Sequence, residues 1–207
     1  MKTRHTGKDG FMALKLDMSK AYDRVEWEFL KHVMLKMGFS TQWVSLMMEC
    51  ISSVSYSILV NGSPQGLLKP TRGLWQGDPL SPYLFLFRAE GLHGLLKQAA
   101  NDAVIRGISL SQGGPRLTHL FFADDSLLFC RAKRDECETL LHILAQYEAV
   151  SGQQINRDKT TLFFSKSTPI HIQTDLFQLL GAPAVKEYEK YLGLPSFVGR
   201  SRRESFT

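Results

Sequence analysis

The sequence has few cysteines, no long apolar run and no glycine-rich phosphate loop. Its three cysteines, Cys50, Cys130 and Cys137, are odd in number and lack metal-ligand spacing, which favours a reducing compartment over a disulfide scaffold or zinc site. No apolar run reaches the length of a membrane span, and the first residues do not form a signal peptide. We therefore expect an intracellular protein without a membrane partner, nuclear or cytoplasmic. No Walker-type glycine loop is present that could serve as a phosphate cradle.

The remaining composition is that of an ordinary globular domain. With 207 residues, 43% hydrophobic and 22% charged, the chain is long enough to bury a core and predicts one domain. A net charge of +5 and a pI near 9.1 lean towards anionic partners without proving that the chain binds nucleic acid.

Hydrophobic periodicity predicts an α+β fold. Residues 11–17 read as a strand that ends in an acid, and Asp23 with Glu26 reads as a capping box that opens a helix ending near Gly38. Residues 54–60 alternate in the strand manner up to an Asn-Gly turn. Further expected elements are a helix from Ser81-Pro82, a hairpin over about 117–130, a helix over about 133–150, and strands near 161–165 and 190–194. This order favours an antiparallel sheet backed by helices.

An adjacent acidic pair, Asp124 and Asp125, lies in the apolar string FFADDSLLF of the expected hairpin. Like charges repel and burial penalises both, so a buried pair needs a compensating cation. Carboxylates suit a hard divalent ion such as Mg²⁺. The alternative is an ordinary exposed turn, in which aspartate is common. The pair alone leaves both interpretations open.

Five sequence blocks set this pair in context. They are residues 17–23 (DMSKAYD), 72–82 (RGLWQGDPLSP), 122–125 (FADD), 151–159 (SGQQINRDK) and 191–195 (YLGLP). In this order they resemble the palm motifs of reverse transcriptases from non-LTR (LINE-type) retrotransposons, particularly those of plants. The resemblance covers nearly the whole chain. It implies one partial polymerase palm domain over residues 1–207, with a ferredoxin/RRM-like core and RNA-directed DNA polymerase activity.

The resemblance also implies the ligands and partners. Asp17 and Asp124 would bind two Mg²⁺ ions, with Mn²⁺ as an alternative, and Asp125 would assist at one of them. The backbone carbonyl of Met18 would be a further ligand. Two-metal transfer needs carboxylates from separate strands that converge on one point, and a strand end plus a hairpin can supply them. The implied partners are an RNA template, a DNA primer and deoxynucleoside triphosphates.

Other residues match family positions around the incoming nucleotide. Tyr22 matches the aromatic ring under the sugar, which excludes a 2′-hydroxyl by its bulk. Gln76 and Gly77 match the segment beside the nascent base pair, and Lys159 matches a proton donor to the departing pyrophosphate. The structural alternatives are a half-buried aromatic for Tyr22 and a surface lysine for Lys159. For Asp23 we prefer a capping role to a catalytic one.

Tyr191, Leu192 and Gly193, within the segment near 190–196, match the primer grip, and a plain β-turn is the alternative. Trp75 departs from the family, which usually has a basic residue there, so a contact to phosphate is lost while an indole can still stack on a base.

Three further expectations concern the whole chain. We expect the fingers, thumb and endonuclease regions of the parent protein to lie outside it. An inert retroelement remnant with at most weak nucleic-acid binding is the alternative function. An aspartyl-phosphate receiver or phosphatase would need a parallel sheet, which the hairpin signals oppose.

Overall fold

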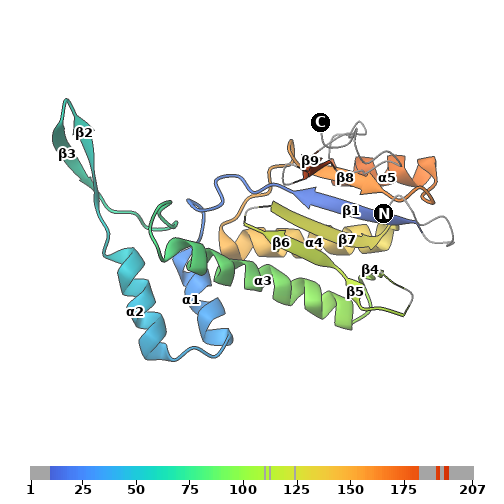
Figure 1. Cartoon of the computed structure of the whole chain (residues 1–207), viewed down its shortest axis with the longest axis horizontal. Coiled ribbons are helices and arrows are strands. Elements are labelled where there is room, and N and C mark those ends of the chain that lie inside the picture. The colour runs from blue at the N-terminus through green and yellow to red at the C-terminus, as the bar shows by residue number, and fades with distance from the viewer. Residues whose placement is uncertain are drawn as a thin grey trace. The chain divides into compact units, whose positions relative to one another are not determined.

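The computed structural model describes residues 10–109, 111, 113–123 and 125–181, together with the backbone of two short strands at 190–191 and 194–195. The chain forms two compact units (Figure 1). The first comprises Met1–Asp17, Leu96–His142 and Asn156–Thr207, and the second comprises Met18–Leu95 and Ile143–Ile155. The described residues form helices and strands whose pairings are all antiparallel, which confirms the predicted α+β class.

The first unit is built on an antiparallel four-stranded sheet in the order β6-β7-β1-β8. Its strands are β1 (Phe11–Leu16), β6 (His119–Phe122), β7 (Asp125–Arg131) and β8 (Thr161–Phe164). Leu14 lies opposite Leu128 on one side and Leu162 on the other, and all three are buried. The predicted strand over 11–17 and the predicted acidic hairpin are therefore confirmed. Apolar residues alternate along these strands, and this pattern determines which side chains face the core.

Helices cover the face of this sheet that carries Leu14. The first part of α4 (Arg134–Ser151) brings Cys137 close to Cys130 of β7, and α5 (Ile170–Leu180) packs Phe177 edge-on against Phe164 of β8. Arg134 Nη1 and Asp175 Oδ1, 2.9 Å apart, link the two helices. The opposite face, which carries the alternate residues of each strand, is left for the site described below.

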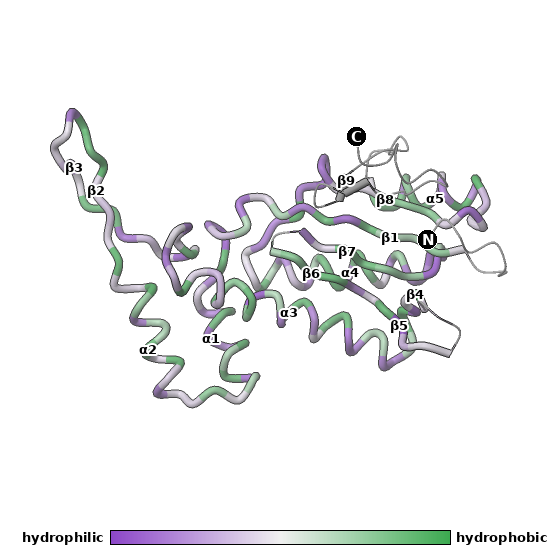
Figure 2. Tube along the Cα trace, viewed as in Figure 1, coloured by the Kyte–Doolittle hydropathy of each residue, from purple (hydrophilic) through white to green (hydrophobic). Residues whose placement is uncertain are grey.

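The second unit contains α1 (Trp27–Lys36), α2 (Thr41–Ser52), a hairpin of β2 (Tyr56–Val60) and β3 (Ser63–Leu68), and most of α3 (Ser81–Asn101). The predicted Asn-Gly turn is confirmed, since Asn61 and Gly62 have φ of 51° and 81°, as a type I′ turn requires. Strand β2 of this hairpin is apolar but exposed (Figure 2): Ile58 and Leu59 are 59% and 69% accessible.

Several predicted helix details are wrong. α1 begins at Trp27, its N-cap Glu26 makes no side-chain cap hydrogen bond, and Asp23 lies in the preceding turn, so there is no capping box. Ser81 does not cap α3 by a hydrogen bond, because its hydroxyl is buried without a partner; instead the Asp78 carboxylate accepts the Leu80 N–H at 2.8 Å. α2, α5 and the small strands β4 (Ile108–Ser109) and β5 (Arg116–Leu117) were not predicted. The last strands are β9 (Lys190–Tyr191) and β10 (Leu194–Pro195).

Gly152 follows the last residue of α4 and packs closely against other residues of the second unit. Its φ is +73°, and a Cβ there would overlap the Arg24 carbonyl and the Glu26 side chain. We expect Gly152→Ala to lower the free energy of unfolding by about 1–3 kcal/mol, because the backbone is left-handed and its neighbours cannot yield freely. Gly94→Ala is the matched control, since that helical position has open space. Equal unfolding free energies for the two variants, measured in urea, would contradict this packing.

The three cysteines differ in accessibility. Burial raises the pKa of Cys137 from 9.0 to about 12 and holds the pKa of Cys130 well above its usual value, while Cys50 is exposed. Because the thiolate is the reactive form, we expect one thiol to react with Ellman's reagent at pH 8 and three after denaturation. A reaction of all three native thiols at similar rates would show that the face beneath α4 opens readily.

Candidate active site

Asp17 and Asp125 lie at the same end of the sheet. Leu16 pairs with Ser126. Asp17 follows Leu16 and Asp125 precedes Ser126, so continuing this antiparallel register makes Asp17 and Asp125 the next facing positions. Leu16 and Ser126 are buried on the helix-covered face, and alternation puts the two aspartates on the opposite face. Both are partly exposed, and 30% of the Asp17 side chain is accessible. The structure thus brings together carboxylates that lie far apart in the sequence.

The turn between β6 and β7 is tight. Phe122 pairs with Asp125, and Ala123 has φ of 51°, a left-handed conformation that alanine rarely adopts. Asp124 lies outside the described residues, so the structure places only Asp125 of the acidic pair.

Lys159 approaches the same carboxylate. Its Nζ lies 4.0 Å from Asp17 Oδ2, and its side chain is 70% exposed, so this pair adds little to stability. The sequence separation between Asp17 and Lys159 does not predict that their side chains lie this close. It arises because Asn156 N–H donates to the Asp17 carbonyl at 2.9 Å, which ties the loop that contains Lys159 to the end of β1.

The β-bridge that follows Asp17 does not engage the Met18 carbonyl. Met18 forms an antiparallel bridge with Ile155, and the hydrogen bonds of that bridge come from the flanking residues, Asp17 with Asn156 and Ser19 with Gln154. In such a pair the central residue's own N–H and C=O point away from the partner strand. The Met18 carbonyl is therefore not used by Ile155.

Tyr22 belongs to the second unit and is half-buried. Its ring stacks on the Phe85 ring of α3, with the centroids 4.3 Å apart and the planes 2° from parallel. The stack leaves the Tyr22 ring partly accessible with a fixed orientation. Nothing in the sequence around Tyr22 pointed to Phe85 as its partner.

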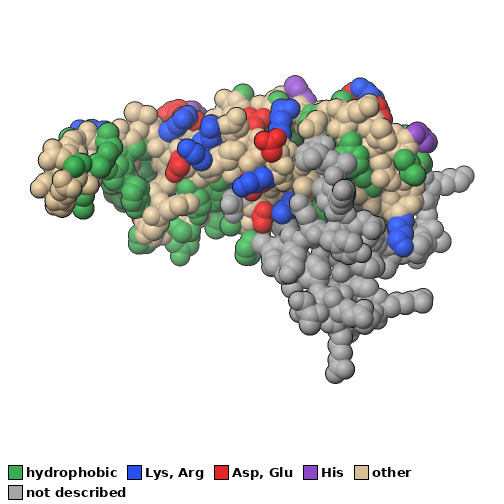
Figure 3. Space-filling model, turned by 90° about the horizontal axis from the view of Figure 1, so that it is seen from above, with side chains coloured by type: hydrophobic (Ala, Val, Ile, Leu, Met, Phe, Trp, Pro, Cys, Tyr) green, Lys and Arg blue, Asp and Glu red, His purple; other side chains and the backbone are tan. Residues whose placement is uncertain are grey.

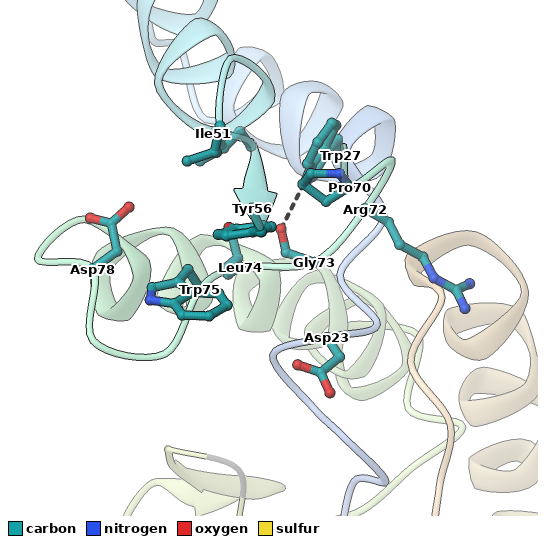
Figure 4. A pocket seen from close by; sticks show the side chains of 11 residues that line it. Asp23, Trp27, Ile51, Tyr56, Pro70, Arg72, Gly73, Leu74, Trp75 and Asp78 are labelled. Atoms are coloured by element: carbon teal, nitrogen blue, oxygen red, sulfur yellow. Dashed lines mark hydrogen bonds between the residues drawn. The ribbon is translucent and has the colours of Figure 1, made fainter. Parts of the chain in front are cut away.

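Gln76 and Gly77 lie exposed in the loop before α3, and Gly77 has a φ of 103° that favours glycine. In the same loop, the Trp75 ring stacks on Tyr56 at 4.6 Å (Figure 4). The two rings border a pocket of ≈ 180 Å³ whose rim includes Asp23 and Asp78. Trp75 is 58% exposed, so the indole offers apolar surface where a cation was expected.

Of the primer-grip residues, the backbone of Tyr191 is part of β9, while Leu192 and Gly193 lie outside the described residues.

On the face drawn in Figure 3, basic side chains are interspersed with acidic ones. No helix among the described residues is long and apolar enough to cross a membrane.

The donor set suits a hard divalent cation. Asp17 and Asp125 supply oxygen ligands from neighbouring strands on one face of the sheet, and oxygen is the donor that Mg²⁺ and Mn²⁺ prefer. No group of three or more acidic, histidine or cysteine side chains that could hold a metal ion occurs among the described residues, which do not include Asp124. Two of the three proposed carboxylate ligands are thus described, and their oxygen donors suit a divalent metal ion.

Comparison with known sequences gives a consistent family. A family model described as reverse transcriptase (RNA-dependent DNA polymerase) matches residues 2–195. An uncharacterized mitochondrial protein of Arabidopsis thaliana is 53% identical over 33% of this chain and 56% of its own length. A transposon-encoded 149 kDa protein of Xenopus laevis is 26% identical over 87% of the chain. A Pol polyprotein of a Drosophila melanogaster retrotransposable element is 25% identical over 86%. The chain spans only 13% and 17% of the last two proteins.

Solved structures support the fold. Apo telomerase from Candida tropicalis, truncated from its C-terminal domain, superposes with a TM-score of 0.64 at 14% identity, covering 90% of this chain and 34% of that one. Telomerase from Candida albicans in complex with a fragment of telomeric RNA gives a TM-score of 0.58 at 16% identity, covering 89% and 29%. At these identities the likeness establishes the palm-like α+β fold alone.

Proposed function

The chain belongs to the reverse transcriptase family, and from this premise we propose that it is the RNA-directed DNA polymerase domain of a non-LTR retroelement. The reaction would join a deoxynucleotide to the 3′-hydroxyl of a DNA primer on an RNA template. One observation carries the proposal: Asp17 and Asp125 flank the paired residues Leu16 and Ser126 at one end of the sheet, within a chain that matches the family over residues 2–195.

Reverse transcriptases generally use divalent metal ions. In the proposed site Asp17, Asp124 and Asp125 would hold two Mg²⁺ ions, with the Met18 carbonyl as a further ligand. Bound there, such ions would lower the pKa of the primer hydroxyl and neutralise charge on the leaving pyrophosphate. The protein supplies the carboxylates from adjacent strands, so the ligands are positioned before the substrate binds. Mn²⁺ suits the same oxygen donors.

Three other residues have proposed roles around the nucleotide. Lys159, whose ammonium group lies 4.0 Å from Asp17, would give a proton to the pyrophosphate. Tyr22, held flat on Phe85, would leave no room for a 2′-hydroxyl. Gln76, exposed in its loop next to Gly77, would contact the nascent base pair.

Addition of one nucleotide to a primed RNA template tests the proposal. The assay uses the purified chain, a labelled DNA primer, one complementary deoxynucleotide and Mg²⁺ or Mn²⁺. We expect a primer longer by one nucleotide only when the metal and the complementary nucleotide are present. Binding of the primed template without any addition, under both metals, would favour the alternative of an inert, weakly binding remnant.

A further inference from the structure

A buried arginine lies next to the Tyr22 stack. Arg88 of α3 is only 2% exposed, and its Cζ lies 3.9 Å from the centroid of the Phe85 ring. Its Nη1 donates to the Tyr147 hydroxyl at 2.9 Å, while its Nε has no hydrogen-bond partner. No carboxylate forms an ion pair with Arg88 within the part of the chain that the structure describes.

Arg88 and Tyr22 lie on opposite faces of Phe85. The Tyr22 ring is parallel to Phe85 at 4.3 Å, and the guanidinium carbon lies over the same ring at 3.9 Å. Two groups this close to one ring cannot share a face without overlapping. Phe85, itself 2% exposed, is therefore held between a tyrosine and a cation.

The energetics suggest a role beyond stability. Burying a guanidinium without a carboxylate costs several kcal/mol, which a cation–π contact and one hydrogen bond offset only in part. An apolar side chain of similar length would fill the site without this penalty. What the arginine adds is a directional contact, because the ring quadrupole favours a cation over the centre of Phe85 and so fixes the ring.

We propose that Arg88 is a positioning residue for sugar selection. Its guanidinium holds the face of the Phe85 ring opposite Tyr22, and Phe85 in turn sets the plane and height of the Tyr22 ring. This inference rests on the proposed function, in which Tyr22 excludes ribonucleotides. A ring that can tilt admits a 2′-hydroxyl, so loss of the clamp affects ribonucleotides far more than deoxynucleotides.

Nucleotide addition by Arg88→Met, Arg88→Lys and Tyr147→Phe tests the proposal. In Arg88→Met we expect the ratio of kcat/KM for the deoxynucleotide to that for the ribonucleotide to fall by about tenfold or more, mainly through a lower ribonucleotide KM. Arg88→Lys keeps a cation over the ring and should restore much of the ratio. Tyr147→Phe keeps the cation–π contact and should leave the ratio unchanged. An unchanged ratio in Arg88→Met, or an equal loss with both nucleotides, would overturn the proposal.

A second measurement needs no catalysis. Nitration of Tyr22 by tetranitromethane, followed by peptide mass spectrometry on each folded variant, reports how firmly the ring is held. We expect Arg88→Met to raise the Tyr22 rate about fivefold, with the rates of Arg88→Lys and Tyr147→Phe near that of the parent chain. Equal rates in all four proteins would overturn the clamp. If the parent chain adds no nucleotide, the proposed function fails, while the nitration rates still decide the role of Arg88.

Discussion

Asp17→Asn is expected to reduce nucleotide addition by about 10³-fold, an effect of the size seen when a principal group that stabilises transition-state charge is removed. Asparagine keeps the shape of the side chain but not its charge, and Asp17 lies at the end of β1, next to the pair formed by Leu16 and Ser126. The loss should appear in kcat more than in KM, because the proposed ions act on the reacting atoms. Single-turnover addition to a primed RNA template measures it.

Asp158→Asn is the matched control for this experiment. Asp158 is exposed, neighbours Lys159 and has no proposed role, so its removal should change the rate by less than about twofold. Urea unfolding of both variants shows whether a loss of rate reflects a loss of fold. Addition that persists in folded Asp17→Asn would remove Asp17 from the reaction.

Glu136→Ala is expected to cost about 3–5 kcal/mol of unfolding free energy, the usual penalty for removing one partner of a buried ion pair. Glu136 is 1% exposed. Its Oε2 accepts the backbone N–H groups of Arg106 and Arg131, both at 2.9 Å, and its Oε1 pairs with the Arg131 Nε. The variant removes the shared acceptor of these donors, which tie the start of α4 to β7 and to the loop that contains Arg106.

Glu138→Ala provides the comparison, because Glu138 is exposed and pairs with Arg134 four residues earlier on the same helix. That surface pair should be worth about 0.5 kcal/mol or less. The difference is read from urea unfolding curves of both variants with unchanged slopes. A loss below about 1 kcal/mol in Glu136→Ala would show that other acceptors or water replace the carboxylate.

Much of the sheet could be predicted, because it depends on local alternation. β1, the β6–β7 hairpin and the Asn-Gly turn each carry a period-two pattern or a turn residue with a defined conformation. α2 was missed because only Val44 and Ile51 are buried, which makes its apolar stripe too narrow to recognise. α5 follows Pro169 without a side-chain cap, so the usual start signal is missing.

The site residues were recognisable from motifs, but their surroundings were not. The register that brings Asp17 opposite Asp125 follows from an acid at a strand end and a hairpin. The stack of Tyr22 on Phe85, the stack of Tyr56 on Trp75 and the burial of Glu136 depend on tertiary packing. Ser81 is buried, and the Asp78 carboxylate accepts the Leu80 N–H just before α3 begins. None of these contacts has a signature in sequence spacing.

Direct measurement of metal binding tests the central claim, that the open face of the sheet holds divalent ions between Asp17 and the acidic hairpin. Titration of Mn²⁺, followed by the electron paramagnetic resonance signal of the free ion, compares the parent chain with Asp17→Asn and Asp158→Asn. We predict bound Mn²⁺ in the parent chain and in Asp158→Asn, and an affinity at least about tenfold lower in Asp17→Asn. Equal Mn²⁺ binding in all three proteins, or none in the parent chain, would contradict a metal-dependent polymerase site at Asp17.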